Sequence, residues 1–204
     1  MVVFWGGRMA VYPVRVTQAP AHTRPALPSA GSGSWVHLVE EGLVRAVAIT
    51  SEGREFGMGL MGPGEVFLQA SGEAVRGIAF YVEALEDSRF VSVTGDELAT
   101  VARQDSGLAA RLLQGLCLRA CDLDEMAASL ALEPVAERLQ RVLRRVGTRH
   151  GELDGGGRRV RLRQQDVASM TGACREAVNA ALRDLEAQGA VRRGRHMLWL
   201  DLEQ

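Results

Sequence analysis

Four polar side chains between residues 175 and 183 have the types and the spacing needed to contact DNA bases and phosphates. They recur at helical intervals and therefore share one face of a predicted helix: Arg175, Glu176, Asn179 and Arg183. A guanidinium can donate two hydrogen bonds to guanine O6 and N7, a carboxylate can accept one from cytosine N4, and a carboxamide can pair with adenine. The opposite face of this helix is apolar and is expected to pack on a core: Val178, Ala181, Leu182 and Leu185.

A shorter predicted helix precedes this one and is separated from it by Gly172. Its apolar side chains Val167, Ala168 and Met170 form one face, and glycine tolerates the left-handed backbone that a sharp turn needs. Helix, short turn and helix is the helix-turn-helix pattern, whose second helix can enter the major groove. The alternative is an ordinary helical hairpin inside a core, which has no need of four polar groups on one face.

Basic residues near the C-terminus support a DNA-binding role for this part of the chain. Residues 134–204 carry a net charge of +5 and residues 1–133 a net charge of −6, which is typical of a separate nucleic-acid module. Gln165 and Arg183 are predicted to contact phosphates. The same role, or that of a plain solvated turn, is open for the arginines at the tip of a predicted β-wing: Arg192, Arg193 and Arg195.

These residues resemble the C-terminal DNA-binding module of the Crp/Fnr superfamily of bacterial transcription regulators. The matching segments are residues 165–168 at the start of the first helix, Gly172 in the turn, residues 175–178 at the start of the second helix and residues 182–186 near its end. The family often has a further arginine at the position that is Ala180 here, so the preferred operator is expected to differ at that base step. The resemblance implies double-stranded DNA and RNA polymerase as partners.

The N-terminal part has the pattern of an antiparallel β domain. Short strands separated by glycine turns are expected at Val36 to Val39, Leu43 to Thr50, Phe56 to Met61, Ile78 to Leu85 and Arg89 to Val93, with a further possible strand at Val11 to Val16. The turn at residues 63–67 resembles one in the sensor domain of the same superfamily. The fold class is therefore predicted as α+β: an N-terminal antiparallel, cupin-like β-barrel or jelly roll of the cyclic-nucleotide-binding type, a long dimerisation helix, and a C-terminal winged helix-turn-helix.

The sensor residues of the cyclic-AMP-binding members are replaced. Where they carry Gly-Glu to hold the ribose, this chain has Leu68-Gln69, and where they carry Arg-Ser or Arg-Thr to hold the phosphate it has Ile78-Ala79. A buried phosphate needs a cation and hydrogen-bond donors, which these side chains do not offer. We therefore predict no cyclic-nucleotide site and no cofactor.

The sequence contains no motif for an iron–sulfur cluster, a metal site or catalysis. There is no cysteine before Cys117 that could hold a cluster, and the four histidines are scattered without ligand spacing, so no metal site is expected. No catalytic residues and no enzymatic activity are predicted, because the chain lacks a nucleophile motif, a metal triad and a phosphate loop. Three cysteines without disulfide spacing and no long apolar run indicate a cytoplasmic protein that does not enter a membrane.

A heptad pattern between residues 109 and 130 predicts two helices packed side by side. It begins at Ala109 and continues through the six residues expected at a homodimer interface: Leu113, Leu116, Ala120, Leu123, Ala127 and Leu130. The alternative is one helix packed on its own β domain. The expected domains are a sensor-like β domain at 1–102, a dimerisation helix at 103–132 and a winged helix-turn-helix domain at 133–204.

Together these features predict a homodimeric, sequence-specific transcription regulator that binds a near-palindromic operator without cyclic AMP. The alternative is a dimeric regulator gated by a different small ligand, or by oxidation of Cys117, Cys121 or Cys174. A dimeric protein-interaction module that does not bind DNA also remains open, and it would show no salt-dependent DNA affinity.

Overall fold

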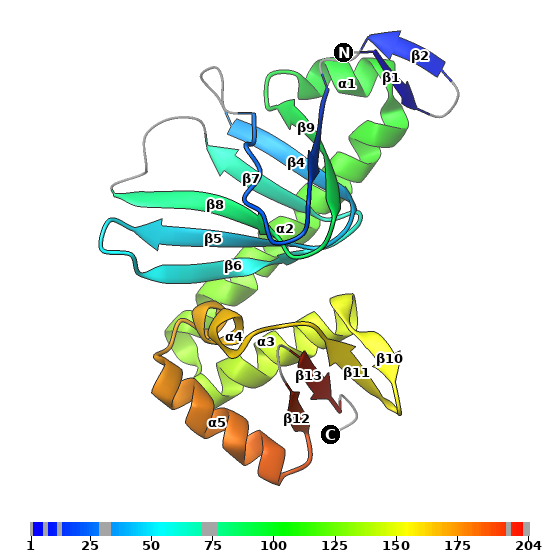
Figure 1. Ribbon diagram of the computed structural model, residues 1–204. Helices are drawn as coiled ribbons and strands as arrows, with labels where there is room; N and C mark the ends of the chain where they lie inside the picture. The colour runs from blue at the N-terminus through cyan, green and yellow to red at the C-terminus, as the bar shows by residue number, and fades with distance from the viewer. Residues whose placement is uncertain are drawn as a thin grey trace. The chain divides into compact units, whose positions relative to one another are not determined.

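The computed structural model describes residues 2–5, 8–11, 14–28, 34–70, 77–194 and 197–201. The chain forms two compact units, one comprising residues 1–53 and 60–123 and the other residues 54–59 and 124–204. Figure 1 shows strands in the N-terminal part, the long helix α2, and a C-terminal group of helices and short strands. No helix within the described ranges is long and apolar enough to cross a bilayer.

The strands before α1 form two antiparallel sheets and a two-stranded hairpin. The hairpin pairs β1 (Val2–Trp5) with β2 (Arg8–Val11). One sheet has the order β3-β9-β4-β7, and its strands are β3 (Arg15–Ala19), β9 (Ser88–Thr94), β4 (Ser34–Glu41) and β7 (Val66–Ala70). The other has the order β6-β5-β8, and its strands are β6 (Glu55–Met61), β5 (Val44–Thr50) and β8 (Ile78–Ala84).

The fold class was predicted as a β-barrel or jelly roll, and the two separate sheets fit the jelly roll; among the described residues they do not form a closed barrel. Alternation along the strands explains why the sheets pack, since successive side chains point to opposite faces. One face of β4 and β9 joins an apolar cluster between the sheets that includes Val39, Phe67 and Phe90. The other face packs on α2 through Leu38 and Val93.

The predicted helix at 103–132 is instead two helices, α1 (Leu98–Gln104) and α2 (Ser106–Leu132). The break lies at Asp105, whose Oδ1 accepts a hydrogen bond of 2.8 Å from the backbone N–H of Leu108. A carboxylate in this position satisfies a free N–H of the first turn of α2, which favours a new helix start over continuation.

The C-terminal elements belong to the second unit. Helix α3 (Val135–His150) begins directly after Pro134 and packs against α4 (Gln164–Thr171) and α5 (Arg175–Ala187). A four-stranded sheet has the order β10-β11-β13-β12, formed by β10 (Glu152–Asp154), β11 (Gly157–Val160), β13 (Met197–Leu200) and β12 (Val191–Gly194). Strands β10 and β11 form a hairpin, in which Gly155 and Gly156 adopt the positive φ angles of a tight turn.

Candidate nucleic-acid interface

The helix-turn-helix is formed by α4 and α5, and Gly172 ends α4 as predicted. Its backbone is left-handed, with φ 62° and ψ 30°, which is a conformation that glycine adopts without a steric penalty. A Cβ atom at this position would lie 2.9 Å from Leu130 Cδ2 of α2. The turn therefore requires glycine both for its dihedral angles and for its close approach to α2.

Asp166 fixes the start of α4. Its side chain is buried, and its carboxylate accepts hydrogen bonds from the Arg163 backbone N–H at 3.1 Å and from the Arg163 guanidinium at 3.0 and 3.1 Å. This arrangement holds the chain entering α4 against its first turn. The residues that follow Arg163, including Gln164 and Gln165, are thereby placed on a rigid helix start.

The predicted base-reading residues lie on the exposed side of α5. Arg175, Glu176 and Arg183 are exposed, Asn179 is half-buried, and the helix is anchored by buried Val178, Ala181, Leu182 and Leu185 on its other side. Arg175 and Glu176 occupy the first turn of α5, as the sequence indicated. Such a helix start is where base edges are contacted by helix-turn-helix proteins.

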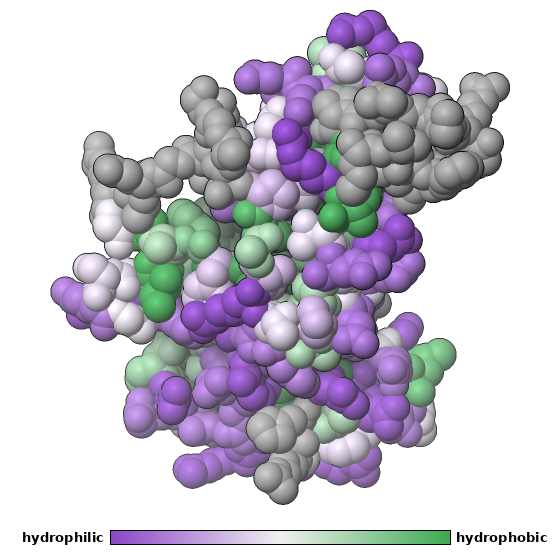
Figure 2. All heavy atoms as spheres, turned by 45° about the horizontal axis from the view of Figure 1, so that its top comes forward, coloured by the Kyte–Doolittle hydropathy of each residue, from purple (hydrophilic) through white to green (hydrophobic). Residues whose placement is uncertain are grey.

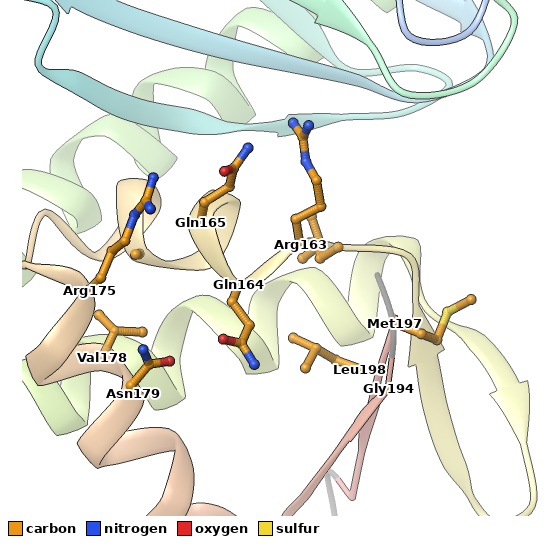
Figure 3. Close-up of a pocket in the computed structure, with 11 residues that line it drawn as sticks. Arg163, Gln164, Gln165, Arg175, Val178, Asn179, Gly194, Met197 and Leu198 are labelled. Atoms are coloured by element: carbon orange, nitrogen blue, oxygen red, sulfur yellow. The ribbon is translucent and has the colours of Figure 1, made fainter.

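A groove of about 440 Å³ separates α5 from the wing. Its lining includes Gln164 and Gln165 of α4, Arg175 and Asn179 of α5, and Met197 at the wing. Figure 3 shows the side chains of Gln164 and Asn179 directed into the groove, whereas Arg163, Gln165 and Arg175 extend from its rim in a common direction. Gln164 was not among the residues predicted from the sequence. Its neighbour Gln165 has the same side chain, and only the structure shows that Gln164 is the one directed into the groove.

Two of the three predicted wing arginines, Arg192 and Arg193, lie on β12 and have different surroundings. Arg192 is exposed, and its guanidinium lies 4.6 Å from the ring centroid of Trp199 in a cation–π contact. The guanidinium of Arg193 forms an ion pair with Glu186 of α5, and this hydrogen bond lowers the pKa of Glu186 and raises that of Arg193. Arg195 lies outside the described residues.

Gly194 matters for the shape of the wing. A Cβ atom there would lie 2.7 Å from Cζ3 of Trp199, so the strand approaches the indole ring more closely than any other residue would allow. The indole Nε1 donates a hydrogen bond of 2.9 Å to Asp154 Oδ2. Trp199 of β13 thus contacts Asp154 of the other hairpin through its indole N–H and Arg192 of β12 through its ring.

The four positions where cyclic-AMP-binding proteins carry their ligand residues lie on β7 and β8. Leu68 is 46% exposed and Ile78 is 39% exposed. Together with Phe80, they belong to the exposed large hydrophobic side chains, and Figure 2 shows hydrophobic patches interrupting a largely hydrophilic surface. None of the four residues Leu68, Gln69, Ile78 and Ala79 provides a charged group.

Comparison with known proteins agrees with this architecture. Residues 137–204 match the model of the Crp-like helix-turn-helix domain. The CRP-like cAMP-activated global transcriptional regulator of Mycobacterium tuberculosis is 28% identical over 175 residues, which cover 84% of this chain and 78% of that protein. The cyclic AMP receptor protein of Thermus thermophilus is 29% identical over 168 residues, covering 79% of this chain and 73% of the relative.

Residues 137–204 thus have the sequence of a Crp-like helix-turn-helix domain, and most of the chain is similar to Crp-type transcription regulators. Solved structures share its fold, among them a CooA variant from Carboxydothermus hydrogenoformans, with a TM-score of 0.71, 18% identity, and coverage of 94% of this chain and 85% of that one. A CRP/FNR-family regulator from Thermus thermophilus has a TM-score of 0.69 and 22% identity, covering 93% and 95%. Crp/Fnr members are DNA-binding regulators rather than enzymes, so the winged helix-turn-helix described above is a DNA-binding domain.

The remaining predicted sites can be located in the structure. Of the predicted interface residues on α2, Leu113 is 64% exposed and Leu130 is 38% exposed, whereas Leu116 packs partly against the β domain of its own chain. All three cysteines are exposed. No group of three or more potential metal ligands occurs in the described part of the chain.

Proposed function

We propose that this Crp/Fnr protein is a homodimeric regulator that binds a near-palindromic operator sequence-specifically and does not require cyclic AMP. The observation that carries the proposal is the groove between α5 and the wing, with Arg175 at its rim and Gln164 and Asn179 directed into it. The major groove of DNA admits an α-helix, and the exposed start of α5 presents polar side chains that suit base edges there. We further propose, by analogy with the relatives of this chain, that it acts in the cytoplasm with RNA polymerase as a partner.

Each polar residue of the surface has a proposed role in this complex. Arg175 donates to guanine O6 and N7, Glu176 accepts from cytosine N4, and Asn179 pairs with adenine. Residues expected to contact phosphates and fix the register are Gln165, Arg183, Arg192 and Arg195. Arg193 has the same predicted role, but its ion pair with Glu186 favours a structural contribution to the wing.

Dimerisation is proposed through α2. The exposed Leu113 side chain supports this, since a 27-residue helix that leaves large apolar groups in solvent gains stability when a second copy covers them. Sedimentation of the wild type and of Leu113→Glu tests it. The wild type is expected to be a dimer and the variant a folded monomer, and a monomeric wild type would exclude the dimer.

Independence from cyclic AMP rests on the chemistry of β7 and β8. The Mycobacterium relative is described as cAMP-activated, but this chain offers neither a carboxylate nor a guanidinium at Leu68, Gln69, Ile78 and Ala79. A ribose and a cyclic phosphate would remain without charged partners at these positions. The ligand-free protein is therefore expected to bind its operator tightly.

Selection from a random pool of duplexes is the experiment that tests the proposed function. The bound sequences are expected to converge on an inverted repeat with half-site centres about 10–10.5 base pairs, or one helical turn, apart. Replacing Arg175 by alanine should cost roughly 1–3 kcal/mol and relax the preference at one base pair. The matched control is Arg15→Ala, which removes a partly exposed arginine from the β domain and should leave the preference unchanged.

Gating by a different small ligand is the second candidate, and one observation favours it. His37 Nε2 and Gln69 Oε1 are buried and have no hydrogen bond of good geometry among the described residues, although an interaction with the Gln69 side chain raises the pKa of His37 against the larger, opposite effect of burial. Unpaired buried polar atoms are uncommon, and a bound molecule would satisfy them. A screen of small polar compounds by thermal shift, repeated on His37→Phe, tests this: a ligand that stabilises only the wild type supports the candidate, and equal shifts contradict it.

A further inference from the structure

At the joint between α2 and α3, one carboxylate accepts hydrogen bonds from side chains of both helices. Glu133 lies between the end of α2 at Leu132 and the start of α3 at Val135. Its Oε2 accepts a hydrogen bond from Ser129 Oγ at 2.5 Å and from Arg141 Nε at 3.1 Å, and the Arg141 guanidinium makes a second contact with Oε1. Ser129 is one turn before Glu133 and Arg141 is two turns after it, so the carboxylate bridges the two helices.

A second arginine of α3 reinforces this joint from the other side. Arg138 Nη1 donates to the carbonyl oxygens of Leu130 at 3.4 Å and of Glu133 at 3.2 Å. The last carbonyls of a helix have no partners within that helix, and here a side chain of the next helix satisfies two of them. The end of α2 is therefore fixed against α3 by backbone as well as side-chain contacts.

The last turns of α2 also approach the helix-turn-helix directly. Leu130 Cδ2 lies so close to the turn that a Cβ atom on Gly172 would be 2.9 Å from it. The final turns of α2, α3 and the turn between α4 and α5 consequently form one packed body. A rotation of α2 about the joint would break the Glu133 contacts and move Leu130 off the turn.

We propose that Glu133 is a positioning residue that sets the spacing at which the homodimer accepts its two half-sites. The inference rests on the proposed function, because α2 carries the predicted dimer interface and α5 the predicted base contacts. In a symmetric dimer, the angle between α2 and the DNA-binding domain determines the distance between the two recognition helices. A joint held by hydrogen bonds gives one distance, and a loose joint gives several.

The chemistry of the joint suits this role better than a role in stability. Arg141 is half-exposed, and ion pairs in such settings contribute little to the free energy of unfolding. Preorganisation, in contrast, lowers the entropy that must be lost when both recognition helices engage DNA at once. Loss of the Glu133 contacts is therefore expected to affect bipartite DNA binding much more than folding.

The test uses full-length protein and a set of duplexes in which two fixed half-sites are separated by spacers of increasing length. The wild type is expected to prefer one spacing strongly. Glu133→Gln should lose on the order of tenfold in affinity for that spacing while its affinity for the other spacings changes little, which flattens the profile. Arg141→Glu alone should do the same, and combining it with Glu133→Arg should restore the preference because the ion pair is re-formed with its charges exchanged.

The control is Glu152→Gln, which removes the partner of Arg159 in an exposed ion pair elsewhere in the same domain and should leave the spacing profile intact. Thermal unfolding of all variants separates loss of fold from loss of positioning. The inference is overturned if Glu133→Gln keeps the wild-type profile, or if it loses affinity equally at every spacing. A wild type that shows no sequence preference at all would instead overturn the proposed function, and the inference with it.

Discussion

The exposed side of α5 and the strands β7 and β8 differ in how far their residues match those of Crp/Fnr proteins. Helix α5 begins with Arg175 and Glu176, as the family's recognition helix does, whereas Leu68-Gln69 and Ile78-Ala79 stand where cyclic-AMP-binding relatives carry ligand residues. Both regions retain their cores, with Val178 and Leu182 buried under α5 and Phe67 buried under β7. Cores preserve a fold while the residues on its surface change, so the fold of the β domain by itself does not imply a nucleotide site.

The β domain and the helix-turn-helix also differ in how they bury polar groups. This difference should appear in how the stability of the protein depends on pH. His37 is fully buried in the β domain, where Ser92 Oγ lies 2.8 Å from its Nδ1, and burial lowers its pKa to about 4. An unfolded histidine has a pKa near 6.5, so between pH 6.5 and 4 the unfolded chain binds the extra proton and stability falls as the pH falls. The loss should reach about 3 kcal/mol at pH 4.

Denaturant unfolding at pH 7 and pH 4.5, followed by tryptophan fluorescence, measures this effect. Trp35 is a suitable reporter because its ring centroid lies 6.2 Å from that of His37. The variant His37→Gln should unfold with a much weaker dependence on pH in this range. An identical pH dependence in both proteins would show that other groups are responsible.

The start of α4 provides the next test, because here the buried charge has partners. Replacing Asp166 by alanine removes three hydrogen bonds from Arg163 and should cost roughly 2 kcal/mol of stability. Operator binding should weaken as well, since Gln164 and Gln165 lose their fixed helix start. The exposed Glu152→Ala is the control, and comparable unfolding midpoints for the two variants would contradict the role of Asp166.

The sequence was sufficient for the helix-turn-helix but not for the settings of its individual side chains. Apolar periodicity and Gly172 located α4 and α5, because a core-facing stripe repeats at helical steps. The break at Asp105 was missed, since the heptad pattern begins only at Ala109, and the hydrogen bond from Leu108 N–H to Asp105 reveals the new helix start. The ion pair between Arg193 and Glu186 joins residues of different elements, and such pairings depend on tertiary packing that periodicity does not encode.

Strand β7 was missed for a related reason. Residues 63–67 match a family turn, and this match concealed that Val66–Ala70 pairs with β4. The sequence left a barrel and a jelly roll open, because alternation indicates which side of a strand is buried but not whether the last strand meets the first. Of the predicted interface on α2, Leu116 shows the same ambiguity, since an apolar residue fits its own β domain as well as a partner.

Within the wing, a smaller effect should distinguish Arg192 from Arg193. Arg192 is exposed on the ring of Trp199, so Arg192→Ala should reduce the slope of log affinity against log salt by about one, corresponding to one lost phosphate contact. Arg193→Ala should leave the slope nearly unchanged and lower the stability of the wing, because its guanidinium is already engaged by Glu186. Anisotropy titrations between 50 and 200 mM salt measure both slopes. Equal reductions would indicate that the ion pair opens on DNA.

The smallest expected effect is the response to cyclic AMP, and it bears most directly on the contrast between the two regions. Calorimetric titration with cyclic AMP should give no binding at micromolar concentrations, and operator affinity should be the same with and without it. The Mycobacterium relative, described as cAMP-activated, is the positive control under the same conditions. Micromolar binding by this chain would mean that groups other than Leu68, Gln69, Ile78 and Ala79 hold the phosphate and ribose. In that case the β domain would bind the nucleotide through residues at other positions. It would then be a ligand-binding domain, as α5 is a proposed DNA-binding element.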